Sequence, residues 1–144
     1  MFFCELGAKY LSEVEVNSWA SNQHEFNGVA PLKRLFGCSR QYVCATFMYY
    51  DGSGLVDRQD VDLTWYDARE SHPTRSEFRL YYTENAIVRR AHVNDLLIIG
   101  KQDSGDIVVI IAQNGSPYCH ALQTMLGITA ITTHYVTLSN LTVN

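Results

Sequence analysis

The chain has 144 residues, a length that favours one domain with a hydrophobic core of its own. Hydrophobic residues make up 47% of the sequence, which excludes an intrinsically disordered chain. The formal net charge of −4 excludes a general nucleic-acid coat protein, because non-specific binding to phosphates needs a positive surface. The charge is unevenly distributed, with aspartates gathered in residues 51–67 and arginines in residues 69–90. A local basic patch on an acidic domain is compatible with sequence-specific contact to DNA.

The cysteines and the apolar segments indicate in which cellular compartment the protein is located. Cysteine occurs at positions 4, 38, 44 and 119 without any Cys-x-x-Cys spacing, so we expect reduced thiols. The first ten residues have no basic leader and do not resemble a signal peptide. No apolar stretch is long enough to span a membrane. The sequence therefore predicts a cytoplasmic protein with no membrane partner.

Short strands and turns are expected in the first part of the chain. Strands are predicted at residues 2–6, 10–16, 41–50 and 55–66. The second of these rests on Leu11, Val14 and Val16, which lie among polar residues. Residues 31–36 are expected to form a short helix, since Pro31 suits its first position and Gly37 its end.

An unusually polar stretch, residues 17–28, precedes this helix. It shows little periodicity and closes with Asn27-Gly28, a turn signal. Asn22 and Gln23 carry amides of the kind that pair bidentately with adenine, and His24 follows directly. An ordinary polar connecting loop explains the same composition.

The chain is centred on residues 63–82. This stretch opens as a strand, breaks at the polar segment 67–73, and resumes as a predicted strand at 74–82. In the second half, Arg75, Glu77 and Arg79 alternate with other residues and fall on one face. Arginine pairs bidentately with guanine and glutamate accepts from the amino group of cytosine, so this row can read C·G pairs from the major groove. The alternative is a cross-strand ladder of salt bridges on a solvated face.

The remaining residues predict small helices around buried strands. Helices are expected at residues 83–92 and 116–126, and near-continuous apolar strands at residues 95–100 and 106–112. Residues 128–144 carry no charge and are rich in threonine, and we interpret them as a tail or the start of a linker. Short strands, hairpin turns and small helices predict an all-β, barrel-like domain.

Patterns for catalysis and metal binding are absent from the sequence. Nucleases of the PD-(D/E)xK type need an acid-x-Lys triplet, and no acid stands two residues before Lys9, Lys33 or Lys101. No histidine is paired with another metal ligand at i, i+3 or i+4 within a helix, and no nucleophile elbow, P-loop or dinucleotide motif occurs. We therefore expect no catalytic residue, cofactor or metal in this chain.

A block of residues in the central stretch resembles a known DNA-binding arm. It consists of Tyr66, Arg69 and then a Thr-Arg-x-Glu-x-Arg run made by Thr74, Arg75, Glu77 and Arg79. The block is similar to the DNA-contacting arm in the N-terminal effector-binding domain of EcoRII-type restriction endonucleases. Residues 9–28 fall where that family has its first arm. The resemblance covers most of residues 2–127.

The resemblance implies a mainly β, seven-stranded-type open pseudobarrel with short flanking helices, similar to the DNA-binding domains of plant transcription factors. Two arms would embrace the major groove of double-stranded DNA at a CCWGG-like site. In that bacterial family the domain regulates a separate C-terminal nuclease domain, which is absent here and which alone would need Mg²⁺. Residues 1–127 would be the DNA-binding domain, and residues 128–144 the tail or linker.

Residue chemistry and resemblance together predict the site. The expected base readers are Arg75, Glu77, Arg79, Asn22, Gln23 and His24. The residues expected to hold the DNA backbone or brace the arms are Arg69, His72, Thr74, Ser76, Trp65, Tyr66, Asp67, Ser21, Glu25, Asn27, Lys9 and Lys33. Three alternatives stay open: a recognition domain for a different DNA site, a metal-dependent nuclease active on its own, and a protein-interaction module that uses the tyrosine-rich surface.

Overall fold

The computed structural model of the protein describes residues 1–17, 24–127 and 131–143, which are mainly β. The strands are β1 (Phe2–Tyr10), β2 (Glu25–Phe26), β3 (Gln41–Asp51), β4 (Gly54–Asp67), β5 (Phe78–Tyr82), β6 (Leu96–Gln102), β7 (Ile107–Ala112) and β8 (Val136–Thr142). The helices are α1 (Glu13–Val16), the 3-10 helix η1 (Ala30–Leu32), α3 (Lys33–Phe36), α4 (Ala86–Arg90) and α5 (Pro117–Leu126). The mainly β, open pseudobarrel with short flanking helices is confirmed, with eight strands among the described residues.

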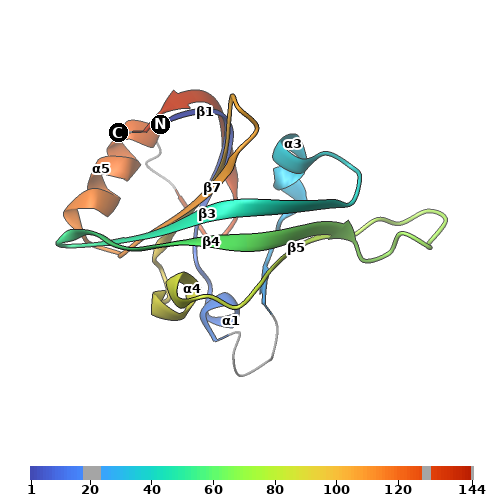
Figure 1. Cartoon of the computed structure of the whole chain (residues 1–144), viewed down its shortest axis with the longest axis horizontal. Helices are drawn as coiled ribbons and strands as arrows, with labels where there is room; N and C mark the ends of the chain where they lie inside the picture. Colours follow the sequence, from blue (N-terminus) through green and yellow to red (C-terminus); the bar gives the residue numbers. More distant parts are fainter. Residues whose placement is uncertain (18–23, 128–130, 144) are drawn as a thin grey trace.

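The strands form one open, strongly curled sheet in the order β2-β5-β4-β3-β7-β6-β1-β8. Neighbouring strands are antiparallel except β3 and β7, which are parallel. In Figure 1, α5 and the connection between β4 and β5 lie at opposite ends of the molecule. The long β3–β4 hairpin therefore carries that connection well away from α5.

β6 and β7 are buried on both faces, which explains their near-continuous apolar sequence. Alternate residues of β6 enter two separate cores. Leu97 and Ile99 pack in a core with Trp65, whereas Ile98 packs in a second core with Leu122 of α5. The sheet is thus fixed from both sides at its centre.

β4 is buried on one face only. Val61, Leu63 and Trp65 are buried, and Asp60 and Asp62 alternate with them and are exposed. Asp60 and Asp62 therefore lie on the solvent side of the sheet.

The prediction of a strand at residues 10–16 is wrong, because residues 13–16 form α1. Ser12 caps this helix: its Oγ accepts from Glu15 N at 3.4 Å, and Ser12 N donates to Glu15 Oε1 at 3.0 Å. This reciprocal capping box satisfies two donors that a helix start otherwise leaves free. It outweighs the alternation of apolar residues and leaves Val14 exposed.

The prediction of a tail is wrong for residues 136–142, which form β8 at the edge of the sheet. β8 pairs with β1, with Phe2 opposite Thr142 and Ala8 opposite Val136. Threonine, valine and leucine suit a half-buried strand, so the composition that suggested a linker is also that of an edge strand.

Gly100 in β6 marks a close approach of the buried Phe3 ring to the sheet. A β-carbon at residue 100 would lie 2.5 Å from Cδ1 of that ring. We expect Gly100→Ala to lower the free energy of unfolding by about 1–3 kcal/mol, because the packed ring must shift to admit a methyl group. Urea denaturation measures this loss. Gly52→Ala is the control, since its β-carbon would meet nothing within 4 Å; equal midpoints for both variants would contradict the steric argument.

Candidate nucleic-acid interface

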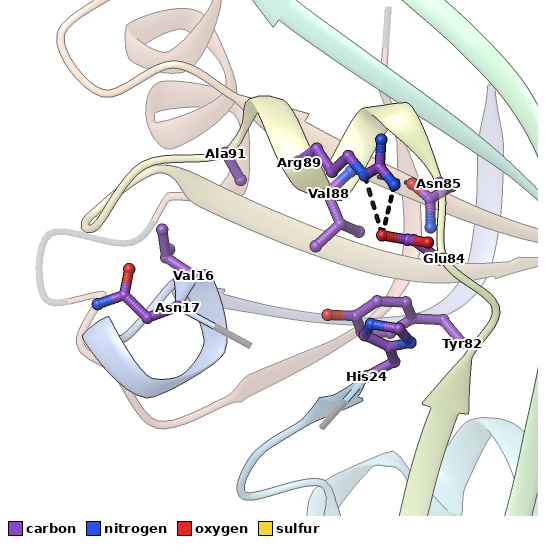
Figure 2. A pocket seen from close by; sticks show the side chains of 9 residues that line it. All are labelled: Val16, Asn17, His24, Tyr82, Glu84, Asn85, Val88, Arg89 and Ala91. Carbon is purple, nitrogen blue, oxygen red and sulfur yellow. Dashed lines mark hydrogen bonds and ion pairs between the residues drawn. The ribbon is translucent and has the colours of Figure 1, made fainter. Parts of the chain in front are cut away.

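The described end of the predicted first arm, residues 24–28, joins the sheet through β2. Glu25 pairs with Tyr81 of β5, and Tyr82 N donates to His24 O at 2.9 Å. The His24 ring is stacked on the Tyr82 ring, with centroids 5.8 Å apart (Figure 2). Residues 24–26 therefore lie against β5, which continues from the central stretch. Ser21, Asn22 and Gln23, three of the predicted contact residues, lie outside the described residues.

The second arm, residues 68–77, connects β4 to β5 and is closed at its base by Asp67. Asp67 Oδ1 accepts from Glu77 N at 2.7 Å and from Arg69 N at 2.9 Å. The bond from Glu77 N is the largest cause of the lowered pKa of Asp67, because it favours the charged carboxylate. The closed base makes the arm a narrow ribbon that projects beyond the sheet (Figure 1).

This closure should depend on pH. The pKa of Asp67 is lowered in the closed arm, so the carboxylate contributes stability above the usual aspartate pKa of 3.8 and loses it as the pH falls through the lowered value. We expect the amide resonances of Arg69 and Glu77 to shift together below about pH 4 in NMR spectra. Asp67→Asn should shift them at neutral pH, and Asp103→Asn, in an exposed hairpin, should not. Amide resonances of Arg69 and Glu77 that do not shift over this pH range would contradict the closure of the arm by Asp67.

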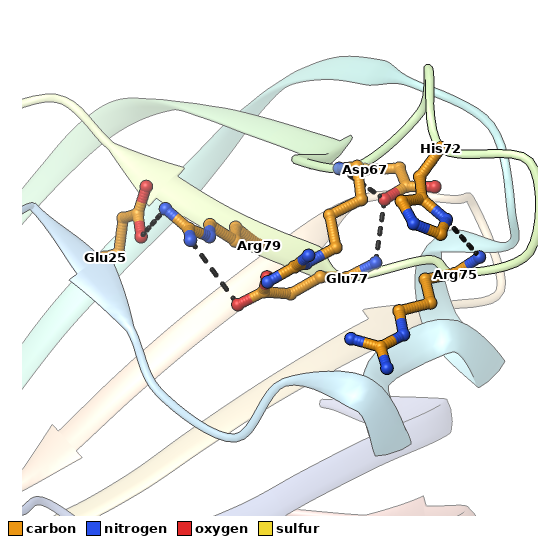
Figure 3. A network of polar contacts seen from close by, with 7 residues as sticks. Glu25, Asp67, His72, Arg75, Glu77 and Arg79 are labelled. Carbon is orange, nitrogen blue, oxygen red and sulfur yellow. Dashed lines mark hydrogen bonds and ion pairs between the residues drawn. The ribbon is translucent and has the colours of Figure 1, made fainter.

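His72 shapes the tip of the second arm. Its Nδ1 accepts from Thr74 N at 3.2 Å and from Arg75 N at 3.1 Å (Figure 3). The strand predicted from residue 74 therefore begins only at Phe78, and Arg75 stands on a loop, together with the exposed Thr74 and Ser76. The Arg75 side chain is exposed and has no hydrogen-bond or ion-pair partner within residues 1–17, 24–127 and 131–143.

A continuous row of charges links the two arms. Arg69 Nε donates to Glu77 Oε2 at 3.0 Å, and Arg79 Nη2 donates to Glu77 Oε1 at 3.4 Å (Figure 3). Arg79 Nη1 lies 3.8 Å from Glu25 Oε2, and Tyr66 OH donates to Glu25 Oε1 at 2.7 Å. This is the salt-bridge ladder that the sequence left open. Its members are partly exposed, so the ladder contributes little to stability.

Lys9, predicted to hold the DNA backbone or brace the arms, is buried. Its side chain is 1% exposed, and Nζ lies 2.7 Å from Glu15 Oε2. Lys9 Nζ also donates to Asn27 O at 3.0 Å, and Asn27 N donates to Glu15 Oε2 at 2.8 Å. Lys9 and Glu15 therefore hold the backbone of the first arm at Asn27, the residue before its closing glycine.

Trp65 is likewise buried and braces the second arm. Its ring is stacked against Phe36 and Phe78, with centroids 5.0 Å and 5.1 Å away. Its Nε1 donates to Gly37 O at 3.0 Å. Lys33 covers the same cluster, with Nζ 4.9 Å from the centre of the Phe78 ring. The start of β5 thus packs against both α3 and β4.

Arg40 belongs to this surface although sequence reasoning missed it. Its guanidinium lies 5.4 Å from the centre of the Tyr66 ring and 3.8 Å from Glu70 Oε1. The pairing of Gln41 with Trp65 brings it there. That pairing joins two strands, so no local pattern around residue 40 could reveal the position.

The surface made by the described parts of the two arms and by the residues beside them combines both signs of charge. The cations are Lys33, Arg40, Arg69, Arg75 and Arg79, and the carboxylates are Glu25, Asp67, Glu70 and Glu77. The surface therefore presents hydrogen-bond donors and acceptors at fixed positions, but its mixed charges do not produce a strong positive potential.

Metal binding, membrane insertion and relation to known proteins also bear on the site. Among the described residues, no three His, Cys, Asp or Glu side chains are grouped so that they could hold a metal ion. No helix in the same ranges is long and apolar enough to cross a membrane. No protein-family model and no curated protein matches the sequence. The geometry of the two arms is therefore the basis for assigning a function.

Proposed function

We propose that this chain is a non-catalytic, sequence-specific domain that binds double-stranded DNA and reads a CCWGG-like site from the major groove with its two arms. The observation that carries the proposal is the placement of Arg75. It stands near the tip of a projecting ribbon, its backbone is fixed by His72, and its guanidinium has no partner among the described residues. An arginine in this setting is available to a ligand without breaking an existing ion pair.

The shape and chemistry of the second arm suit the major groove. That groove is about 12 Å wide and admits a two-stranded β-ribbon. Arg75 and Arg79 offer the bidentate donors that guanine O6 and N7 accept. Glu77 is an acceptor for the amino group of cytosine, and its hydrogen bond from Arg69 lowers its pKa and keeps it ionised at neutral pH.

The ladder of ion pairs is compatible with this role. Arg79 is 41% exposed and Glu77 45%, so exchanging their mutual contact at 3.4 Å for contacts to bases costs little. Arg69 and His72 would then position the arm or contact phosphates, as would Lys33 and Arg40 beside it.

The domain would serve as the recognition part of a type II restriction endonuclease, as its resemblance to EcoRII-type enzymes implies. Cleavage would belong to a separate nuclease domain, and Mg²⁺ to that domain. Such a system would act in the bacterial cytoplasm.

A gel-shift assay at moderate salt tests the proposal. We expect the chain to bind a short duplex that carries CCWGG more tightly than a scrambled duplex of equal length. Equal, weak binding to both would retain DNA binding and reject this site, and selection from random duplexes would then identify another. Failure to bind any duplex at low salt would favour the protein-interaction module.

The same preparation separates recognition from cleavage. We expect no cleavage of plasmid DNA by the chain with Mg²⁺, because no catalytic set of residues is found in the sequence. Cleavage that persists in highly purified protein would contradict the non-catalytic assignment.

A further inference from the structure

A cavity of about 480 Å³ lies at the C-terminal end of β5, and its described lining (Figure 2) includes no residue of the second arm. Its described lining comes from the end of α1, from the first arm and from α4 with the residues before it. The volume is within the range of about 300–1,000 Å³ typical of small-molecule sites. Neither the charge ladder nor the tip of the second arm contributes to it.

One wall of the cavity is flat and aromatic. The half-buried His24 ring forms this wall. Behind it lies the Tyr82 ring, which is 1% exposed and whose plane is 25° from that of His24, with the centroids 5.8 Å apart. Val16, Val88 and Ala91 supply apolar surface on other sides (Figure 2). A flat ring beside aliphatic side chains favours a planar ligand that can stack.

A donor and an acceptor stand side by side at the cavity. Arg89 Nε donates to Glu84 Oε1 at 3.1 Å, and Arg89 Nη2 donates to the same oxygen. This hydrogen bonding lowers the pKa of Glu84, because it favours the charged carboxylate. Glu84 Oε2 and Arg89 Nη1 have no hydrogen-bond partner within the described ranges. One acceptor thus lies next to one donor.

The wall behind this pair is fixed. Asn85 Oδ1 accepts from Val88 N at 2.9 Å, and its Nδ2 donates to Thr83 O at 2.9 Å. Both polar atoms of the Asn85 amide are therefore used within the protein, and this amide is not available to bind a ligand. Asn17, which is exposed where α1 ends, supplies a further amide at the rim.

We propose that this cavity binds a single nucleobase. A base is planar and stacks on aromatic rings, and its edge presents hydrogen-bond donors beside acceptors, which matches Glu84 and Arg89. The base could belong to a free nucleotide or be rotated out of a duplex. The second source rests on the proposed DNA binding; the first does not. β5 spans five residues, so the cavity lies roughly 15 Å from the end of the second arm, within the reach of one bound duplex.

Calorimetric titration with AMP, GMP, CMP and TMP tests the free source. We expect one nucleotide to bind, Glu84→Gln to weaken its binding at least tenfold, and Asn17→Trp to block it. Glu13→Gln is the matched control, because Glu13 is exposed on α1 and does not line the cavity. Binding that is unaffected by both cavity variants would place the nucleotide elsewhere and overturn the proposal.

Duplexes with 2-aminopurine placed at one position at a time test the extruded source. We expect fluorescence to rise at one position when the chain binds, and Asn17→Trp to abolish the rise. A signal in this assay alone assigns the cavity to an extruded base, and a signal in the titration alone assigns it to free nucleotide. The proposal is overturned when both assays are negative, that is, when no nucleotide binds in the titration and no position gives a fluorescence rise. This holds whether or not the duplex itself is bound. Failure of duplex binding alone rejects the proposed function and leaves the titration to decide.

Discussion

Glu15→Leu should lower the free energy of unfolding by about 3–5 kcal/mol, because it leaves the Lys9 ammonium buried without its counter-ion. Both side chains are 1% exposed, so water cannot replace the lost carboxylate. The substitution also removes the acceptor for Ser12 N and Asn27 N. Urea denaturation measures the loss. Glu13→Leu is the control two residues away on the same helix, where the side chain is exposed.

Loss of Lys9 and loss of Glu15 should lower the free energy of unfolding by different amounts. In Lys9→Met the Glu15 carboxylate keeps hydrogen bonds from Ser12 N at 3.0 Å, Ser12 Oγ at 2.9 Å and Asn27 N at 2.8 Å. Lys9→Met should therefore lower the free energy of unfolding less than Glu15→Leu does, since these hydrogen bonds still compensate the buried Glu15 carboxylate. The double variant should recover part of the loss of Glu15→Leu. Strictly additive losses would show that the two side chains do not act as a pair.

Arg75→Ala and Arg79→Ala should each weaken binding to the preferred duplex by about 5- to 150-fold, equivalent to about 1–3 kcal/mol. If these arginines read bases, the loss should fall on one base pair, and duplexes altered there should bind both forms equally. Competition gel shifts with single-substituted duplexes measure this. Arg58→Ala is the control, because Arg58 is an exposed arginine of β4 that pairs with Met48 near the opposite hairpin.

Salt dependence distinguishes a base reader from a phosphate contact. Loss of a phosphate contact should weaken binding to all sequences and reduce the salt slope by about one. Arg75→Ala should leave the slope nearly unchanged. Arg79→Ala also releases Glu77 and Glu25 from an ion pair, so part of its effect is repulsion between these carboxylates and DNA. A uniform loss across sequences for both variants would reject base reading.

Elements with local signals could be predicted from the sequence. Ser116, Pro117 and Gly127 mark the two ends of α5, and Gly127 adopts the left-handed conformation expected at a helix end. The apolar runs of β6 and β7 likewise reflect burial on both faces. At α1 two local signals competed, and the capping box of Ser12 and Glu15 prevailed over a strand-like alternation.

The candidate site was only partly predictable, because its geometry depends on contacts between distant segments. The arginines and glutamates of the central stretch could be found from their spacing, and a ladder of salt bridges among them was one of the two interpretations that the sequence left open. Burial of Lys9 requires Glu15 and Asn27 to converge on it, which no spacing indicates. The position of Arg40 follows from strand pairing alone.

The pairing of β1 has a consequence for biosynthesis. β1 lies between β6 and β8, so Phe3 pairs with Gln102 on one side and with Leu141 on the other. On a ribosome, the first strand must wait until residues 96–142 have emerged before its backbone groups find their partners. Long-range pairings of this kind slow folding, and an unpaired apolar strand is exposed meanwhile. A stalled nascent chain that ends before residue 96 should therefore be digested by protease at β1, where the released full-length chain is protected.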